Sequence, residues 1–243
     1  MATAEAPGFR PLYIQVKDLL IKRLVSGDWR PGQVLPSEIK LADEFNVSQG
    51  TVRKALDEMA SVNVLVRRQG KGTYVAAHTH HRALFHFFHL IGEDGSRVLP
   101  ESRVLGTRHR GATRKAAERL SLAPGAPVVI FDRVRSLDGR PTVFETIVVA
   151  ESMFPGLGRP PKDMLPNTVY EYFEQEYGVT IVNAVERVRA AAAGKREARL
   201  LDLAPGAPLL VIDRVAFGLE RRPVEWRLSR CDTSRHHYLS EIE

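Results

Sequence analysis

Two arginines two positions apart, Arg133 and Arg135, have a spacing that suggests a binding chemistry. They lie in a β-rich run where alternate side chains share one face of a predicted strand. Their charges are roughly 7 Å apart and repel each other unless an anion or a carboxylate lies between them. The pair therefore predicts either an anion site or a sheet face that is neutralised by Glu145 or Glu225.

A second basic set, Arg67-Arg68-Gln69-Gly70-Lys71-Gly72, lies between two β-rich runs. Its three cations suit phosphate oxygens, and its two glycines allow the backbone to approach another surface closely. The spacing does not match a phosphate-binding P-loop, and no strand-to-helix junction surrounds it. The run therefore predicts a basic hairpin.

Histidines gather in the segment 78–89, at His78, His80, His81, His86 and His89. No carboxylate or cysteine accompanies them at a useful spacing, which favours solvated linker histidines over a metal site. A pH-sensitive linker remains a second reading of the same residues. The single cysteine of the chain excludes paired-cysteine zinc sites and intrachain disulfides, and no nucleophile motif is visible. The sequence therefore predicts no metal, no cofactor and no catalytic residue.

Three predicted helices precede the basic hairpin. The first spans 11–26, and Ser37 and Ser48 are the predicted N-caps of the second and third. The third helix has one apolar stripe at helical spacing, made of Val52, Ala55, Leu56 and Met59. Its other face carries the polar residues Gln49, Thr51, Arg53 and Lys54. This arrangement predicts a helix-turn-helix with a wing, and the alternative for the third helix alone is an ordinary amphipathic surface helix.

The stretches PLYIQVKDLL, SGDWRPGQVLPSE, LADEFNVS, TVRKAL and RRQGKGTYV carry a family resemblance over residues 11–77. They resemble the winged helix-turn-helix domain of the GntR family of bacterial transcription regulators. The resemblance implies a double-stranded DNA operator as partner, with the hairpin tip directed towards the minor groove. The residues it implies at or near DNA are Ser37, Glu38, Ser48, Gln49, Thr51, Arg53, Arg67, Arg68, Gly70, Lys71 and Gly72.

Gln49 departs from the family, which usually has an arginine at this position. Arginine suits O6 and N7 of guanine, whereas glutamine suits N6 and N7 of adenine. The operator is therefore expected to differ from commoner family sites at that base pair. Gly50 lowers helix propensity by about 1 kcal/mol relative to alanine, so the first turn of the helix is expected to order fully only on DNA.

The remainder of the chain contains an internal repeat with an offset of 81 residues, in which LAPGAP at 122–127 returns at 203–208. Asp132-Arg133-Val134 likewise returns as Asp213-Arg214-Val215, but Ala216 replaces Arg135. Each copy predicts a helix, a turn, a strand, a hairpin and a second strand. The two copies predict an antiparallel sheet with helices on one side, so the fold class of the whole chain is α+β.

The stretches RVRSLDGRP, TVYEYFEQEYGV and RRPVEWRLSRCD carry a second, looser resemblance over about 84–240. They resemble the UTRA effector-binding domain of the HutC branch of the GntR family, whose fold is shared with chorismate lyase. The resemblance implies a homodimer and a small acidic metabolite, such as a sugar phosphate or a carboxylate. The residues it implies at the ligand are Arg133, Arg135, Glu145, Thr168, Tyr170, Glu225 and Arg230. Thr168 stands where serine is usual, and Ser229 and Cys231 replace the usual neighbours of Arg230, which leaves the identity of the ligand open.

Thr168-Val169-Tyr170-Glu171 also matches a capping box, which predicts a helix that ends near Gly178. Such a helix offers amide donors to an anion at its N-terminus.

The 243 residues and the net charge of +6 fit two domains and favour a polyanionic partner without requiring one. The predicted divisions are 8–77 for the winged helix-turn-helix, 78–84 for a linker and 85–243 for effector binding and dimerisation. No export signal and no apolar run of about 18 residues is present, so a cytoplasmic protein without a membrane span is expected.

The predicted function is a homodimeric DNA-binding regulator, most simply a repressor, released by a small acidic metabolite. Ligand held by Arg133 and Arg135 is expected to shift the linker and change the separation of the two DNA-binding domains. The alternatives are a chorismate lyase-like enzyme activity of the C-terminal domain and an architectural DNA protein without an effector.

Overall fold

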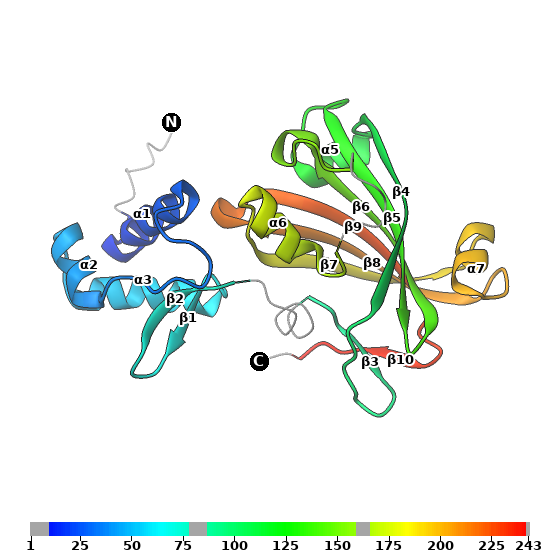
Figure 1. The fold of residues 1–243 in the computed structure, drawn as a ribbon, viewed down its shortest axis with the longest axis horizontal. Helices are drawn as coiled ribbons and strands as arrows, with labels where there is room; N and C mark the ends of the chain where they lie inside the picture. Colours follow the sequence, from blue (N-terminus) through cyan, green and yellow to red (C-terminus); the bar gives the residue numbers. More distant parts are fainter. Residues whose placement is uncertain (1–9, 78–86, 159–165, 242–243) are drawn as a thin grey trace, which may run out of the picture. The chain divides into compact units, whose positions relative to one another are not determined.

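Figure 1 shows the computed structural model, which describes residues 10–77, 87–158 and 166–241. The chain divides into two compact units, Met1–Ala77 and His78–Glu243. His78, His80, His81 and His86 lie outside the described residues, whereas the ring of His89 packs against Tyr238 with centroids 5.4 Å apart. The described residues contain no group of three or more histidine, cysteine or acidic side chains placed to hold a metal ion. None of the described helices is long and apolar enough to cross a membrane.

The first unit is a three-helix bundle followed by a hairpin. Its elements are α1 (Leu12–Ser26), α2 (Glu38–Phe45), α3 (Gln49–Ser61), β1 (Leu65–Arg68) and β2 (Gly72–Val75). The strands are antiparallel, with Leu65 opposite Val75. The predicted stripe of α3 is confirmed, because Val52, Ala55, Leu56 and Met59 are all fully buried.

Serine caps fix the starts of α2 and α3. The Oγ of Ser37 accepts from the amide of Lys40 at 3.3 Å, and the Oγ of Ser48 accepts from the amide of Thr51 at 3.2 Å. α3 is helical from Gln49, and Gly50 lies in its first turn. That this turn orders fully only on DNA stays a prediction. A serine cap contributes about 1 kcal/mol, which offsets the cost of the glycine.

A six-stranded antiparallel sheet, in the order β4-β5-β6-β9-β8-β7, forms the second unit. The strands are β4 (Glu101–Gly111), β5 (Pro127–Leu137), β6 (Arg140–Ala150), β7 (Ile181–Ala192), β8 (Pro208–Gly218) and β9 (Pro223–Cys231). Among the described residues of this unit, three α-helices accompany them, α5 (Arg114–Leu120), α6 (Val169–Tyr177) and α7 (Lys195–Leu201). A separate two-stranded sheet pairs β3 (Leu90–Gly92) with β10 (His236–Tyr238). The described residues also contain the short 3-10 turns Glu151–Met153 and Leu219–Arg221.

The sequence repeat corresponds to the two halves of this sheet. One copy contributes α5, β5 and β6, and the other contributes α7, β8 and β9, as predicted. Each copy also begins with an edge strand, β4 or β7, which the sequence pattern did not reveal. Both edge strands are mostly exposed or half-buried, so they lack the alternating apolar pattern that marks a strand with one buried face.

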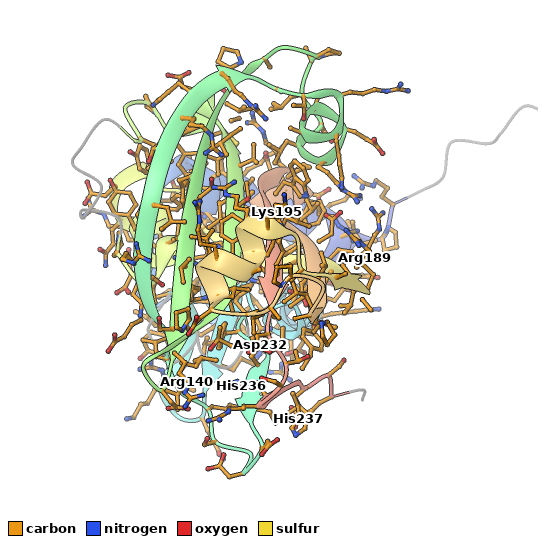
Figure 2. The ribbon with its side chains drawn as sticks, turned by 90° about the vertical axis from the view of Figure 1, so that its right-hand side faces the viewer. Arg140, Arg189, Lys195, Asp232, His236 and His237 are labelled. Atoms are coloured by element: carbon orange, nitrogen blue, oxygen red, sulfur yellow. The ribbon has the colours of Figure 1, made fainter. Side chains whose placement is uncertain are left out.

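Helices cover both faces of the sheet. α5 packs against Ile130 and Val148, and α7 packs against Val134 and Phe144, so the repeat helices lie on the same face, as predicted. Figure 2 shows α7, marked by Lys195, in front of the strands. α6 packs on the opposite face, against a cluster that includes Val129, Phe131, Ile147 and Val149.

Candidate functional site

The first unit gathers its predicted DNA contacts around one carboxylate, that of Glu38 at the start of α2. Its Oε2 accepts from Nε of Arg53 at 2.9 Å and from Nε2 of Gln49 at 3.2 Å, while Oε1 accepts from Nη1 of Arg67 at 2.9 Å. Arg67 also pairs with Asp57 of α3 at 2.7 Å. The carboxylate therefore joins the starts of α2 and α3 to the hairpin.

The charge state of Glu38 follows from these contacts. Partial burial alone would raise its pKa, but hydrogen bonds from Arg53, Arg67 and Gln49 outweigh that effect and hold the pKa below its usual value. Glu38 is therefore ionised at neutral pH and can only accept hydrogen bonds. This fixes the amide of Gln49 with its nitrogen towards Glu38 and its carbonyl oxygen directed elsewhere.

A hollow of the first unit lies between the start of α2, the start of α3 and the hairpin, and Glu38, Gln49, Arg67 and Arg68 line it. Thr51 shares a hydrogen bond of 2.9 Å with the hydroxyl of Ser48. At the hairpin, the guanidinium of Arg68 stacks on Tyr74, and Gly70 and Gly72 have φ angles of 69° and 112°, which favour glycine. The structure thus brings the predicted residues of α2, α3 and the hairpin to one polar surface.

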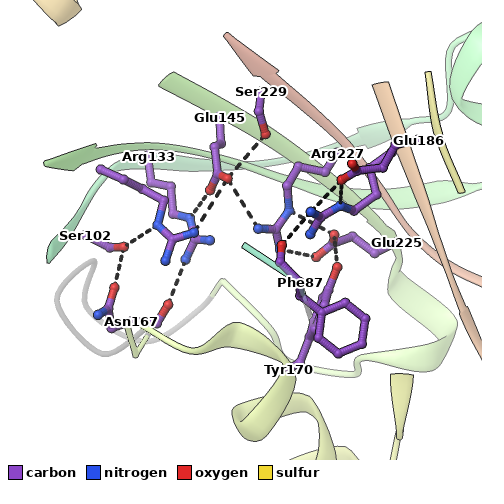
Figure 3. Close-up of polar contacts among 12 residues, drawn as sticks. Phe87, Ser102, Arg133, Glu145, Asn167, Tyr170, Glu186, Glu225, Arg227 and Ser229 are labelled. Atoms are coloured by element: carbon purple, nitrogen blue, oxygen red, sulfur yellow. Dashed lines mark hydrogen bonds and ion pairs between the residues drawn. The ribbon is translucent and has the colours of Figure 1, made fainter. Parts of the chain in front are cut away.

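The second unit contains a buried polar cluster on the α6 face of the sheet (Figure 3). It includes six of the seven predicted effector residues, each at most 6% exposed: Arg133, Arg135, Glu145, Thr168, Tyr170 and Glu225. Sequence reasoning missed four further members, Ser102, Arg214, Arg227 and Ser229, together with Glu186 of β7.

Glu145 is the centre of this cluster. Nε of Arg133 donates to Glu145, Nη1 of Arg227 donates to it at 3.3 Å, and so does the hydroxyl of Ser229 at 3.3 Å. Nη1 of Arg133 also donates to the carbonyl of Asn167 at 3.3 Å. Burial alone would raise the pKa of Glu145, but the neighbouring guanidiniums hold that pKa far below its usual value.

Arg135 is held less firmly than Arg133. Its Nε donates to the hydroxyl of Ser102 at 3.2 Å, its guanidinium lies over the ring of Phe88 at 4.7 Å, and Glu145 is 3.9 Å away. Burial lowers the pKa of Arg135 to about 9, and the like charge of Arg133 contributes to the same shift. The cluster therefore disfavours the charged form of this guanidinium, and burial lowers the pKa of Arg133 as well.

At the other end of the cluster, Arg227 binds Glu225 with two hydrogen bonds, of 2.9 and 2.8 Å. The phenol of Tyr170 donates to the same carboxylate at 2.9 Å. Burial, followed by the charge of Glu225, raises the pKa of Tyr170 to about 12, so the phenol keeps its proton at neutral pH. Arg214 pairs with Glu186 and donates to the carbonyl of Phe87.

Thr168 lies where predicted but makes a different contact. Its hydroxyl donates to Oε2 of Glu171 at 2.8 Å, and its side chain does not cap α6. The predicted capping box is therefore wrong in its hydrogen bonding, although the helix itself begins at Val169 and its C-cap is Gly178. The reason is the backbone of Thr168, whose φ of −100° and ψ of 88° differ from those of the N-cap serines.

Arg230 is the predicted effector residue that the structure does not bring to the cluster. Its Nε pairs with Glu197 of α7 at 3.1 Å, and its guanidinium lies over Phe144, on the α7 face of the sheet. Side chains alternate along a strand, so Glu225, Arg227 and Ser229 share one face of β9 and Arg230 lies on the other. Counting in steps of two from Glu225 would have identified Arg227 and Ser229 from the sequence.

A small hollow adjoins the cluster, lined by Phe87, Phe88, Arg133, Arg135 and Tyr170, among others. Its volume is about 30 Å³, which is room for a water molecule but not for a sugar phosphate. The hollow as it stands is therefore too small for the predicted ligand.

Comparisons with known proteins agree with both units. Residues 96–237 match the UTRA domain, and residues 12–75 match the family described as bacterial regulatory proteins, gntR family. The uncharacterized HTH-type transcriptional regulator YurK of Bacillus subtilis is 30% identical over 228 residues, which cover 93% of each chain. The histidine utilization repressor of Pseudomonas putida is 32% identical over 218 residues, or 89% of this chain and 86% of that protein.

A solved ligand-binding domain from Bordetella bronchiseptica, assigned to a GntR-family transcriptional regulator, has the fold of the second unit. It is 33% identical, with a TM-score of 0.60, and the match covers 65% of this chain and 99% of that one. The relatives are named as regulators and repressors, in agreement with the expectation of a regulator instead of an enzyme. The chain belongs to the GntR family of bacterial regulatory proteins, with a UTRA domain C-terminal to its helix-turn-helix.

Proposed function

We propose that this chain is a transcriptional repressor of the HutC branch, released from its operator by a small acidic metabolite that binds beside Arg135. The observation that carries the proposal is the charge of the buried cluster. Four guanidiniums, of Arg133, Arg135, Arg214 and Arg227, meet three carboxylates, of Glu145, Glu186 and Glu225. One buried positive charge therefore has no counterpart within the cluster.

An unbalanced buried charge is costly, and an anion from outside would offset that cost. Arg135 is the guanidinium concerned, because its nearest carboxylate, Glu145 at 3.9 Å, is already bonded to Arg133 and Arg227. A phosphate or carboxylate accepts two hydrogen bonds from a guanidinium edge. Glu225 and Tyr170 at the other end suit the hydroxyl or amino groups of the same ligand.

The proposed link to the linker runs through Phe87 and Phe88, the first described residues after it. Phe88 stacks under Arg135, and the carbonyl of Phe87 accepts from Arg214. A ligand that draws Arg135 towards its own anion weakens the contact with Phe88 and opens the hollow of about 30 Å³. This is allosteric only if the ligand binds the two arrangements with different affinity.

Operator recognition is proposed to depend on α3, with a homodimer placing two such helices about one turn of DNA apart. The amide nitrogen of Gln49 donates one of its two hydrogens to Glu38, which leaves the carbonyl oxygen and the second N–H for a base. In the major groove, that oxygen accepts from the amino groups of adenine N6 and cytosine N4, and guanine offers none there. The position facing Gln49 is therefore proposed to be adenine in the contacted strand, because adenine offers both the N6 donor and the N7 acceptor.

The rival proposal, a lyase-like activity, has no support among the described residues. The thiol of Cys231 is buried, and burial raises its pKa, so it is a poor nucleophile. A cytoplasmic location is proposed because the relatives are named as transcription regulators of bacteria.

Thermal shift against hexose phosphates, small carboxylates and their uncharged analogues tests this function, followed by gel shift with any compound that raises the melting temperature. The proposal expects charged compounds to stabilise the protein and to release a DNA fragment carrying the operator. Turnover of the compound would support the enzyme instead. Stabilisation by the uncharged analogues alone would contradict the role of Arg135.

A further inference from the structure

A cavity of about 180 Å³ lies on the face of the sheet that carries α5 and α7. β4, the start of α5, and strands β5, β6 and β9 supply its walls. The sheet separates it from the buried cluster, since Thr146 and Val148 line the cavity while Glu145 belongs to the cluster. It is therefore distinct from the effector site, and its occupancy does not depend on the function proposed above.

Most of the cavity wall is apolar. Ala116 of α5 and Ile130, Val148 and Leu228 of the sheet supply aliphatic carbon, and Trp226 supplies an indole. Nε1 of Trp226 already donates to Asp213 at 2.9 Å, so the ring presents carbon to the cavity. A dry cavity of roughly 150 Å³ accommodates benzene, so this one has room for a body of that size.

The rim of the same cavity is cationic, with Arg108, Arg110 and Arg230. Arg108 pairs with Asp132 at 2.8 Å, and Arg230 pairs with Glu197 at 3.1 Å. Within the described ranges, Arg110 has no carboxylate within salt-bridge distance.

The charges around the rim do not balance. Arg196 of α7 also binds Asp132, at 2.7 Å, so four guanidiniums meet only two carboxylates. Burial lowers the pKa of Arg230, and the nearby guanidiniums of Arg196 and Arg189 contribute to the same shift. A guanidinium in this state gains from an added anion.

An apolar pocket with a cationic rim matches a ligand that has a carbon body and one negative end. We propose that this cavity binds a small monocarboxylate with an apolar body of about six carbons. The carboxylate binds Arg110 and Arg230 at the rim, and the carbon body packs against Trp226 and Val148.

Trp226 provides a direct readout. The chain has two tryptophans, and the other, Trp29, lies in the first unit, so Trp29→Phe leaves Trp226 as the single tryptophan. Full-length protein with this substitution is titrated with hexanoate and, separately, with the uncharged hexanamide. The proposal expects a saturable change in fluorescence with hexanoate and at least roughly tenfold weaker binding of hexanamide, because a charge-assisted hydrogen bond is lost.

Matched variants separate this cavity from the effector site. Arg110→Gln and Arg230→Gln are each expected to weaken hexanoate binding about tenfold, while Arg135→Met on the opposite face leaves it unchanged. Arg110 is exposed, and its substitution breaks no ion pair among the described residues, so that variant is expected to fold normally. Thermal unfolding of each variant checks this. Absence of a saturable change, equal binding of hexanamide, or unaltered affinity in both arginine variants would overturn the proposal.

Discussion

Arg135 differs from its buried neighbours because no carboxylate is committed to it. Arg133, Arg214 and Arg227 each bind a glutamate directly, whereas Arg135 has the hydroxyl of Ser102 and the ring of Phe88. The second copy of the repeat has Ala216 at the corresponding position, so the extra charge belongs to one half of the sheet only. This difference between the two copies of the repeat indicates the position of the proposed anion site better than any single motif does.

The affinity for an acidic ligand is expected to depend on pH through Arg135. Burial and the charge of Arg133 lower its pKa to about 9, and only the protonated form attracts an anion. Affinity should therefore be constant between about pH 7.5 and 8.5 and fall as the pH rises above 9, by up to tenfold per pH unit. Calorimetric titration across this range measures the effect, with Arg135→Met as the control that lacks it. A flat profile up to pH 10 in the wild-type protein would contradict this role.

Operator preference is expected to follow Gln49. Gln49→Arg places a guanidinium beside the major groove, where it suits O6 and N7 of guanine. Selection from a randomised operator should recover adenine facing Gln49 in the wild-type protein and guanine in the variant. A discrimination of roughly 1–3 kcal/mol is expected at that base pair and none elsewhere. Recovery of guanine by the wild-type protein would show that Gln49 does not set the preference.

Sequence reasoning located most of the buried cluster but not its full membership. Arg133, Arg135, Glu145, Thr168, Tyr170 and Glu225 come together, while Arg230 lies on the opposite face. Arg230 was wrongly assigned because a family motif indicates only which residues occur together in the sequence. The alternation of side chains along a strand decides which of them lie on the same face. Arg214 is the repeat counterpart of Arg133 and could have been identified from the repeat. Glu186 could not, because its pairing with Arg214 depends on β7, a strand that has no apolar pattern.

At the scale of single elements, the serine cap of Ser48 and the glycine that follows act in opposite directions on α3. A Cβ at Gly50 would meet only the Oγ of Ser48, at 3.8 Å, so alanine fits without strain. Gly50→Ala is expected to raise the free energy of unfolding of the first unit by about 0.5–1 kcal/mol. Chemical denaturation followed by circular dichroism measures this, and Ser48→Ala should lower the same quantity by about 1 kcal/mol. A lower free energy of unfolding for Gly50→Ala would contradict the proposal that Gly50 destabilises the first turn of α3.

The two halves of the sheet are joined by exchanged ion pairs. Asp132 of β5 binds Arg196 of α7 at 2.7 Å, and Asp213 of β8 binds Arg119 of α5 at 2.8 Å. Burial alone would raise the pKa of Asp132, but hydrogen bonds from Arg108 and Arg196 outweigh it and lower the pKa. Each repeat helix therefore stabilises the other copy, so the halves are expected to unfold together.

Asp132→Asn is expected to destabilise the second unit by about 1–2 kcal/mol. The side chain of Asp132 is 1% exposed, but its partners Arg108 and Arg196 are about half exposed and regain water when the pair is broken, which limits the cost. Thermal unfolding monitored by Trp226 measures the loss. An exposed control, Asp202→Asn, should be neutral, and an equal effect of both substitutions would argue against the exchanged pairs.

At the scale of the whole molecule, the helix-turn-helix with its wing and the repeated sheet were both predictable, because each has a sequence signature that is independent of the other. Ser48 capping, the buried stripe of α3 and the LAPGAP repeat at 122–127 and 203–208 all appear in the structure where the pattern placed them. The edge strands were not predictable, because exposed residues on both faces leave no period to detect. The coupling of ligand binding to DNA binding was not predictable either. It depends on how tightly the ligand binds each of two arrangements of the protein, and no local sequence pattern encodes that difference in affinity.

The release of operator DNA by an acidic compound is the measurement that tests the account most directly. Operator affinity is measured by gel shift with and without the compound, in the wild-type protein and in Arg135→Met. In the wild-type protein, the compound is expected to lower the operator affinity at least roughly tenfold, which corresponds to a coupling free energy of about 1.4 kcal/mol. In Arg135→Met, operator binding should persist and the compound should have no effect. Equal release of both proteins would contradict the central role of the excess buried charge at Arg135.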